Sequence, residues 1–384
     1  RSGSVTSDWV FAGNGAACAG SVGSAGDARQ AEVGSMKPYY SDDLVTLFHG
    51  DALQVAESLP SASVLTIVTS PPYFGLRDYG ADGQMGAEAS VGEYVAGMVA
   101  LFRELRRVLK DDGTLWLNLG DTYSFGTTPR HNTNAPNSNR DGSKDTIPPM
   151  SIRPDGTGLA AKNLVGVPWR VALALQDDGW ILRSDIIWAK PNPMPESVTD
   201  RPTKAHEYVF LFAKSPRYFY DADAIAEPVA AATTARLAQN VAGQAGSERG
   251  NGGAKTNGAM KAVGPRFGGT KYGDDDSPES RTKSGNEYVS TGRANKRTVW
   301  QVPTVPFSAA HFAVYPPELI RPCILAGSRT GDTILDPFSG SGTTGMVATQ
   351  EGRKYIGIDL NADYLDLSLQ TRFRQPVLDF GSIA

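Results

Sequence analysis

A serine, two prolines and an aromatic residue follow one another at Ser70-Pro71-Pro72-Tyr73, directly after an apolar, β-rich run. Prolines cannot donate to a strand ladder, so the chain leaves the sheet here in a stiff corner. An exocyclic amino nitrogen, whose lone pair is delocalised into a ring, attacks an electrophile only when acceptors hold both its hydrogens. The Ser70 hydroxyl and Pro71 carbonyl are such acceptors, and the Tyr73 ring could stack on a planar base. For a bare Pro-Pro pair, a simple strand-ending turn is the commoner explanation.

A second cluster surrounds a glycine-rich turn near the end of the chain. Gly340, Gly342 and Gly345 form a GxGxxG pattern between a β-rich and a helical run, and Asp359 ends the next strand, 19 positions after the first glycine. Glycines permit a tight turn and close approach to a ligand, while the acid can accept hydrogen bonds from ribose hydroxyls. The pattern predicts an adenosyl ligand but does not separate NAD from S-adenosylmethionine. No Lys-Ser/Thr pair follows the glycines, which disfavours a phosphate-binding P-loop.

Both clusters lie at the ends of short β-rich runs that alternate with helical patterns. The predicted strands are residues 44–51, 64–73, 114–121, 181–190, 207–215, 333–340 and 354–360. Apolar residues recur at three- and four-residue spacing in residues 91–109 and 167–180, which predicts crossover helices. We therefore expect an α/β fold with a doubly wound, mostly parallel seven-stranded sheet, whose ligands bind outside the carboxyl ends of the strands.

Two polar inserts, at about residues 124–163 and 221–300, are longer than ordinary connections and are expected to be functional or disordered. Residues 229–300 hold 11 Lys/Arg and 6 Asp/Glu, a balance of +5, which leaves the rest of the chain at −9 out of a total of −4. A basic insert on an acidic body suits contact with DNA. The other explanation is that these are solvated loop charges.

The composition excludes several classes of protein. With 384 residues and 40% hydrophobic content the chain can bury a substantial core. Its two cysteines, Cys18 and Cys323, are too few for a disulfide framework or a cysteine-rich zinc site, and we expect no metal. No run is long enough to span a membrane and the start lacks a signal-peptide pattern, so we expect a soluble, cytoplasmic protein.

Taken together, the two clusters resemble the amino-group DNA methyltransferases, which modify cytosine N4 or adenine N6. TSPPY is similar to the family's catalytic motif and DPFSGSGTT to its cofactor motif, and matches run from about residue 44 to residue 372. The catalytic motif precedes the cofactor motif, as in the permuted beta group. The resemblance implies a Rossmann-like methyltransferase fold with one antiparallel strand, here residues 207–215, and S-adenosylmethionine as cofactor.

The resemblance also assigns residues to three roles. The catalytic residues would be Ser70, Pro71, Pro72 and Tyr73. The cofactor-binding residues would be Asp51, Phe312, Pro316, Asp336, Phe338, Gly340, Gly342, Thr343 and Asp359. The candidates for base or DNA contact are Phe74, Trp188, Lys190, Asn192, His206 with its neighbour Glu207, Arg293 and Arg297. The alternative role of Trp188 is packing in the core, and that of His206 and Glu207 is ordering of a loop.

The predicted organisation has four parts. Residues 1–35 are a disordered leader or expression remnant ahead of Met36, and residues 36–220 form the catalytic half of the methyltransferase domain. Residues 221–300 form a target-recognition insert and residues 301–384 the cofactor-binding half. The resemblance implies double-stranded DNA at the prokaryotic nucleoid as the partner and a cognate restriction endonuclease as a second one. The chain would be a monomer or homodimer.

Three other classes of protein explain parts of the sequence. Cys323 would have to be the nucleophile of a carbon-5 cytosine methyltransferase, but it lies in an apolar helical pattern, where free cysteine is usually a buried hydrophobe. An NAD-dependent dehydrogenase leaves TSPPY unexplained, and a non-catalytic DNA-binding module predicts DNA affinity that is indifferent to the cofactor. Within the resembled family, serine before Pro-Pro favours cytosine N4, with adenine N6 as the alternative.

Overall fold

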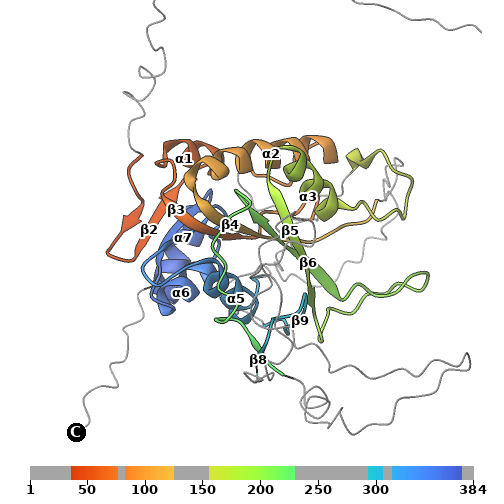
Figure 1. Cartoon of the computed structure of the whole chain (residues 1–384). Coiled ribbons are helices and arrows are strands. Elements are labelled where there is room, and N and C mark those ends of the chain that lie inside the picture. The colour runs from red at the N-terminus through yellow and green to blue at the C-terminus, as the bar shows by residue number, and fades with distance from the viewer. Residues whose placement is uncertain (1–35, 77–82, 125–154, 230–292, 306–313, 374–384) are drawn as a thin grey trace, which may run out of the picture. The chain divides into compact units, whose positions relative to one another are not determined.

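A nine-stranded sheet lies at the centre of the computed structural model, which describes residues 36–76, 83–124, 155–229, 293–305 and 314–373. The strand order is β1-β2-β11-β10-β3-β4-β6-β5-β9. Figure 1 labels β2 to β6 and β9 of this sheet. The strands are β1 (Tyr40–Ser41), β2 (Val45–His49), β3 (Val64–Thr69), β4 (Leu109–Leu119), β5 (Ile181–Ala189), β6 (His206–Ala213), β9 (Val299–Gln301), β10 (Thr333–Asp336) and β11 (Lys354–Asp359).

The centre of the sheet is parallel. β2, β11, β10, β3 and β4 run in one direction, and β5 and β9 share it. β6 is antiparallel to both β4 and β5, as predicted for residues 207–215. The two-residue edge strand β1 is also antiparallel to β2. Consequently the carboxyl ends of the parallel strands and the amino end of β6 meet at one edge of the sheet.

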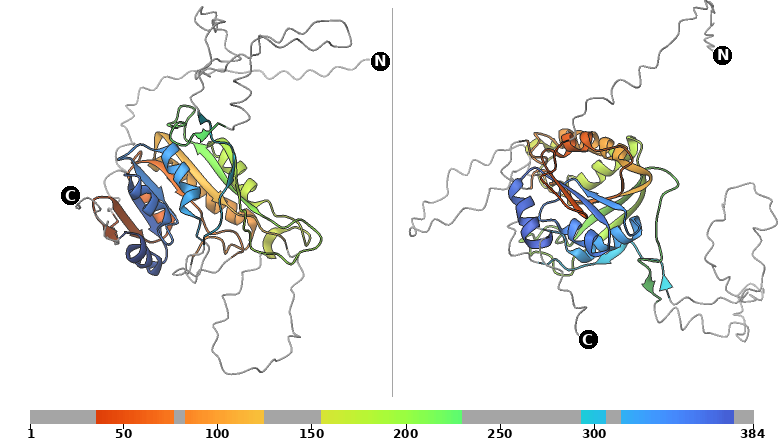
Figure 2. Two further views of the ribbon diagram at one scale, coloured as in Figure 1. Left: turned by 90° about the horizontal axis from the view of Figure 1, so that it is seen from below. Right: turned by 90° about the vertical axis from the view of Figure 1, so that its left-hand side faces the viewer.

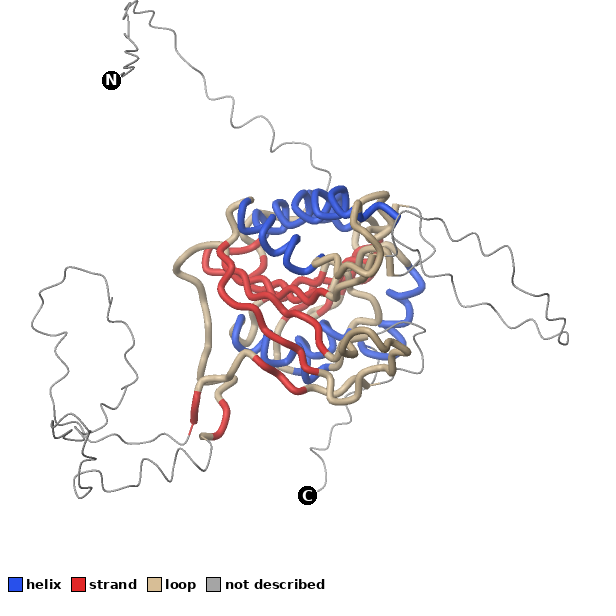
Figure 3. The backbone as a smooth tube through the Cα atoms, turned by 90° about the vertical axis from the view of Figure 1, so that its right-hand side faces the viewer, coloured by secondary structure: helices blue, strands red, loops and turns tan. Residues whose placement is uncertain are grey.

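Helices cover both faces of the sheet (Figures 1 and 3). One layer contains α1 (Ala52–Ser58), α2 (Val91–Val108) and α3 (Val167–Asp177), and the other contains α5 (Pro317–Gly327), α6 (Thr343–Gln350) and α7 (Ala362–Ser368). Short helical turns lie at Asp155–Thr157 and Leu369–Phe373. None of the described helices has the length and apolar content needed to cross a bilayer.

The sequence of α2 shows why these helices form. Ser90 caps the helix by accepting a hydrogen bond from the Glu93 amide at 3.2 Å. Apolar residues then recur on one face, which is buried, while polar residues occupy the other. The buried positions are Val91, Tyr94, Met98, Leu101, Phe102, Leu105 and Val108. Burial of this face, more than intrinsic helix propensity, stabilises the helix.

The predicted α/β fold is confirmed, and each of the seven predicted strands is present. The sheet nevertheless has nine strands, because β1 and β9 add short edges of two and three residues. β4 begins at Leu109 and not at Thr114, since the chain enters the sheet directly from α2 and an irregularity in the pairing with β3 absorbs the intervening residues. Strands as short as β1 and β9 carry too few residues to show a periodic pattern.

The two predicted halves of the methyltransferase domain share this one sheet. β10 and β11 come from the carboxyl-terminal part of the chain, yet they lie between β2 and β3. The 221–300 insert leaves the sheet as a separate two-stranded ribbon of β7 (Glu227–Pro228) and β8 (Arg293–Ala294), visible apart from the sheet in Figure 2. Residues 1–35 and the centre of each long insert lie outside the described residues, so the predicted domain organisation stays a prediction.

Candidate active site

The strand carrying the Ser-Pro-Pro-Tyr corner and the strand carrying the glycine loop are direct neighbours. β3 pairs with β10 in parallel, with Ile67 opposite Leu335, so both strands end at the same edge. The helix that follows β10, α6, and the helix that follows β3, α2, cover opposite faces of the sheet. When helices leave neighbouring strands toward opposite faces, a crevice opens at the carboxyl ends of these strands. This is where α/β proteins bind their ligands.

A cavity of about 950 Å³ occupies this crevice. One part of its wall is formed by Ser70, Pro71, Pro72 and Tyr73, and another by Phe338 to Ser341, Thr343 and Asp359. Further lining residues that bear on function are Asp51, Asn118, Trp188, Lys190, Asn192 and Glu207. The structure therefore brings the two sequence motifs into one cavity.

The Ser-Pro-Pro-Tyr corner is held from two sides. The hydroxyl of Tyr94 in α2 donates to the Pro72 carbonyl at 2.9 Å. The ring of Tyr73 lies so close to Gly120 that a Cβ there would be 2.5 Å from a ring carbon, which only glycine accommodates. The corner is therefore a fixed platform, and its position depends on glycine after β4.

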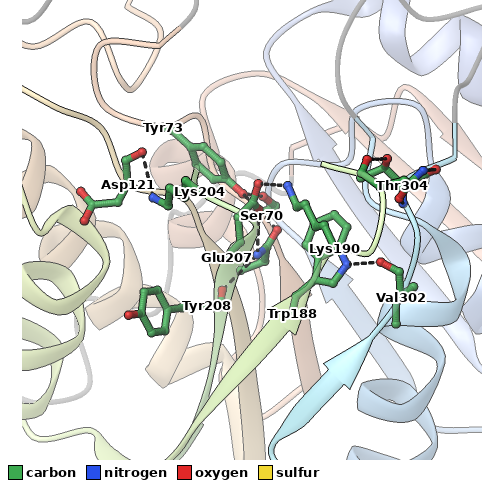
Figure 4. Close-up of polar contacts among 12 residues, drawn as sticks. Ser70, Tyr73, Asp121, Trp188, Lys190, Lys204, Glu207, Tyr208, Val302 and Thr304 are labelled. Atoms are coloured by element: carbon green, nitrogen blue, oxygen red, sulfur yellow. Dashed lines mark hydrogen bonds and ion pairs between the residues drawn. The ribbon is translucent and has the colours of Figure 1, made fainter. Parts of the chain in front are cut away.

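A hydrogen-bond network extends from the corner across the cavity (Figure 4). The Ser70 hydroxyl donates to the Tyr73 hydroxyl at 3.2 Å, and the Tyr73 oxygen lies 2.8 Å from Glu207 Oε2 and 3.0 Å from Asn118 Oδ1. The Asn118 amide donates to Glu207 Oε2 at 3.3 Å and to the Tyr208 carbonyl at 3.0 Å. Ser70 gives its proton to this network and keeps its lone pairs for a ligand.

Lys190 joins the network from the end of β5. Its Nζ pairs with Glu207 Oε1, and the side chains are only 19% and 17% exposed. The same ammonium lies 4.2 Å from the centre of the Trp188 ring, whose indole N–H donates to the Val302 carbonyl at 2.8 Å. Trp188 is 3% exposed, so it serves the core while one edge lines the cavity.

The glycine loop has the backbone that its sequence predicts. Gly340 and Gly342 have φ of 51° and 78°, in the left-handed region that favours glycine. A Cβ at Gly342 would lie 2.8 Å from Ser368 Cβ, whereas a Cβ at Gly340 would meet no atom closer than 4.0 Å. Gly340 therefore gives a ligand close access to the backbone, and Gly342 allows α6 to begin against its neighbours.

Two polar atoms of this loop lack partners. Ser341 Oγ and Thr343 Oγ1 are buried without a hydrogen bond, and both residues line the cavity. Buried hydroxyls normally find partners, so their orphan state points to a ligand with complementary polar atoms. The amino-acid end of S-adenosylmethionine offers such atoms, and Asp359 offers acceptors for ribose hydroxyls. The residues present thus fit this cofactor.

Asp359 accepts hydrogen bonds from the Gly340 amide at 2.7 Å and the Asn361 amide at 2.9 Å. Burial raises the pKa of its carboxyl to about 6, although the two backbone hydrogen bonds act in the opposite direction. Asp51 caps α1, its Oδ1 accepting from the amides of Leu53 and Gln54 at 3.0 Å each. Both acids still line the cavity.

Asp336 lies behind the cavity and not in its wall. It is 1% exposed and accepts hydrogen bonds from Thr69, Thr344, Tyr315 and the Phe338 amide. Burial raises the pKa of its carboxyl against the effect of these donors. Asp336 therefore orders the loop that lines the site, and its assignment to cofactor contact stays a prediction.

Several other sequence-based candidates lie elsewhere. Phe74 is 1% exposed, packs on Tyr94 with 5.7 Å between ring centres and does not line the cavity, so its assignment to base contact stays a prediction. His206 packs edge-on against Tyr208 and does not line the cavity, whereas its neighbour Glu207 does. Pro316 is buried at the start of α5, and the preceding Val314 and Tyr315 line the cavity instead. Phe312 lies outside the described residues.

The two arginine candidates lie at the base of the insert. Arg293 belongs to the β7–β8 ribbon and donates to the Ala226 carbonyl at 3.3 Å. Arg297 follows shortly before β9 and lines a separate surface hollow with Glu227. Neither lines the central cavity, and a role in DNA contact stays a prediction.

Cys323 is excluded as a nucleophile. It is 1% exposed in α5 and burial raises the pKa of its thiol far above the ordinary value.

Asn118 lines the cavity, but the sequence analysis did not identify it as a site residue. Its signal was a lone amide within the otherwise apolar strand TLWLNL, where a polar residue needs a partner.

The fold and the cavity define a doubly wound α/β protein with a ligand-sized cavity at the carboxyl ends of its strands. A family model described as DNA methylase, N6_N4_Mtase, matches residues 64–370. The type II methyltransferase M.Cfr9I of Citrobacter freundii is 45% identical over 325 residues, 84% of this chain and 86% of that protein. M.SmaI of Serratia marcescens is 41% identical over 327 residues, 85% of this chain and 90% of that protein.

Solved structures agree on the fold. The PvuII DNA methyltransferase (cytosine-N4-specific) superposes with a TM-score of 0.55 at 20% identity, covering 89% of this chain and 90% of that one. The chain belongs to the amino-group DNA methyltransferases, the family that modifies cytosine N4 or adenine N6. The prediction of an S-adenosylmethionine-dependent DNA methyltransferase is thereby confirmed.

Proposed function

We propose that this enzyme transfers a methyl group from S-adenosylmethionine to N4 of a cytosine at a specific site in duplex DNA. The observation that carries the proposal is the single cavity lined by both the Ser70 corner and the Gly340 loop. A base inside a duplex cannot reach such a cavity, so the target base must leave the stack, as other base-modifying enzymes require.

Ser70 and Pro71 would hold the two amino hydrogens of the extruded base. Because the Ser70 hydroxyl donates to Tyr73, its lone pairs remain available to accept from the amino group. Holding both hydrogens frees the nitrogen lone pair from the ring and aims it at the methyl group. Alignment of this kind can supply about 7–11 kcal/mol of barrier reduction without a covalent enzyme intermediate.

Tyr73 would have two tasks. Its ring offers the stacking face, and its hydroxyl links Ser70 to Glu207. The amino nitrogen loses one proton as it gains the methyl group. Proton transfer through the hydrogen bonds from Ser70 to Tyr73 and from Tyr73 to Glu207 would bring a proton to the carboxylate. It requires no change in the geometry of the corner.

The choice of cytosine over adenine rests on Ser70. A serine at this position is commonest among the N4 enzymes of the family that the sequence resembles. Serine is a weaker acceptor than a carboxylate and need not be restricted to one base. Methylation of adenine N6 is therefore the alternative.

The cofactor residues follow from the cavity wall. When bound, S-adenosylmethionine supplies a methyl group activated by its sulfonium. We assign Asp359 to the ribose hydroxyls, Asp51 to the adenine end, and Ser341 and Thr343 to polar atoms of the amino-acid end. Gly340 and Phe338 would complete the wall around it.

The experiment uses labelled S-adenosylmethionine and unmethylated DNA of mixed sequence, followed by mass spectrometry of the digested nucleosides. The expected product is N4-methylcytosine, absent when Ser70→Ala replaces the wild type even though that variant still binds the cofactor. N6-methyladenine as the product would overturn the choice of base, and unchanged turnover of Ser70→Ala would overturn the role of Ser70. A cognate restriction endonuclease stays a prediction.

A further inference from the structure

Met194 is exposed at the mouth of the cavity. Its side chain is 86% exposed, the highest value among the large apolar residues of the described chain, and it nevertheless lines the cavity. Val305, 53% exposed, lines the same cavity. Single exposed apolar residues are common on protein surfaces, so exposure alone carries no meaning. Two of them at the entrance of a base-binding cavity form an apolar rim.

The loop that presents Met194 is stiff and anchored. Pro193 and Pro195 flank the methionine and restrict the backbone on both sides. Before them, Asn192 exchanges hydrogen bonds with Thr304: its amide donates to the Thr304 carbonyl at 3.1 Å, and the Thr304 amide donates back at 2.9 Å. The anchors on Thr304 also hold the segment that carries Val305.

The other side of the loop is anchored as well. Glu196 pairs with Arg201 at 2.7 Å, and the Arg201 guanidinium lies 3.9 Å from the centre of the Tyr123 ring. The side chains of Glu196 and Arg201 are 31% and 25% exposed, so the pair is partly shielded from solvent. The loop therefore holds Met194 in solvent, although its neighbours on both sides are tied to the body of the protein.

We propose that Met194 enters the base stack of the DNA at the place that the extruded base leaves. This inference rests on the proposed function, since it requires a base in the cavity. Extrusion opens an apolar gap between the neighbouring base pairs, and methionine is one of the side chains that can fill such a gap. Its unbranched thioether adapts to the gap, and Val305 beside it would cover the edge of the adjoining pair.

The test compares two duplexes that carry a site methylated by the wild-type enzyme. In one duplex the target cytosine is paired with guanine, and in the other it faces an abasic position, so that no base pair has to be broken. For Met194→Ala we expect kcat/KM on the paired duplex to fall by about tenfold, and on the abasic duplex to stay within about twofold of the wild type. Met194→Leu should retain most activity on both.

A fluorescent cytosine analogue at the target position gives a second readout. Wild type should increase its emission by unstacking it, and Met194→Ala should do so much less at saturating protein. Leu173→Ala is the matched control, because Leu173 is a large apolar residue, 49% exposed, on α3 and outside the cavity wall. This variant should behave as the wild type on both duplexes.

The outcomes separate the two proposals. A wild-type protein that methylates no cytosine in unmethylated DNA of mixed sequence overturns the proposed function together with this inference. Methylation by the wild type combined with unchanged activity of Met194→Ala overturns the inference alone. Equal losses of Met194→Ala on the paired and the abasic duplex also overturn it, because they indicate a general loss of DNA affinity.

Discussion

The hydroxyl of Thr69 donates a hydrogen bond to Asp336 Oδ1 at 2.7 Å, and this contact joins the last residues of β3 and β10. Thr69 is the residue before Ser70, and Asp336 begins the glycine loop that lines the cavity. Both side chains are 1% exposed. The distance between the two motifs is thus set by a buried hydrogen bond between adjacent strands.

Thr69→Val tests this link, because valine keeps the shape of threonine but removes the hydroxyl. We expect the free energy of unfolding to fall by about 1–3 kcal/mol, since the buried carboxyl of Asp336 loses a partner. Turnover should fall as well, because the two corners lose their common anchor. Denaturant unfolding and steady-state kinetics measure the two effects. Thr46→Val, which removes a hydroxyl 3.2 Å from Ser41 at an exposed sheet edge, is the control and should change neither quantity appreciably.

Glu207→Gln tests the proton path through Tyr73. Glutamine keeps the size of the side chain but cannot take the proton and cannot balance the Lys190 ammonium. We expect kcat to fall by about a hundredfold, at the low end of what general acid–base catalysis contributes, while the Kd of the cofactor stays unchanged.

The control for this variant is Glu104→Gln, which removes the same charge from a partner of Arg107 on α2, outside the cavity wall. It should retain the kcat of the wild type. Similar kcat values for the two variants would contradict the role of Glu207, as would a loss confined to cofactor affinity.

Cofactor binding should depend on pH through Asp359, whose pKa burial raises from 3.8 to about 6. Ribose hydroxyls donate to the ionised carboxylate, so affinity for S-adenosylmethionine should increase as the pH rises through about 6. Isothermal titration between pH 5 and pH 8 measures this dependence. Asp359→Asn should bind more weakly at pH 8 and lose the dependence; a wild-type Kd that is flat across this range would contradict the assignment.

The stability of the cofactor-free protein should depend on pH in the opposite direction and fall as the pH rises. A carboxyl whose pKa is higher in the folded than in the unfolded state stabilises the fold below the unfolded value of 3.8, and this contribution is lost as the pH rises through about 6. The melting temperature of the cofactor-free wild type should therefore fall as the pH rises from 5 to 8. Asp359→Asn, whose side chain does not titrate, should lose this part of the pH dependence, as thermal melting can show.

Gly342→Ala should destabilise the protein more than Gly331→Ala. Both glycines have positive φ, 78° and 86°, so both substitutions strain the backbone. Only at Gly342 does the added Cβ meet an obstacle, Ser368 Cβ at 2.8 Å, whereas nothing lies within 4 Å at Gly331. We expect a loss of about 1 kcal/mol at Gly331 and about 2–4 kcal/mol at Gly342 in denaturant unfolding. Equal losses would contradict the close approach.

The parts of the fold that the sequence predicts well are those with strong local patterns. The seven longer strands and helices α2 and α3 have clear periodicity, and Gly342 stands where a turn requires positive φ. The adjacency of the two motifs followed from the resemblance and from the rule that ligands bind at the carboxyl ends of parallel strands. The short strands β1, β7, β8 and β9 could not be predicted, because tertiary pairing alone defines them.

Side-chain roles were harder to predict than elements. In β6, His206 and Glu207 are adjacent and point to different sides, so strand register decides which of them lines the cavity. Phe74 directly follows Tyr73 in the sequence, yet packing against α2 buries it. Asp336 matches the family motif, but only the structure shows its carboxylate surrounded by donors from three segments.

The central claim is that Ser70 holds the amino group of an extruded cytosine inside the cavity. A crystal structure of the enzyme with its DNA site and an unreactive cofactor analogue tests it most directly. The claim predicts that the cytosine lies against Tyr73 with its N4 within about 3 Å of both Ser70 Oγ and the Pro71 carbonyl oxygen. A target base that stays stacked in the duplex, or an amino group held by other residues, would contradict it.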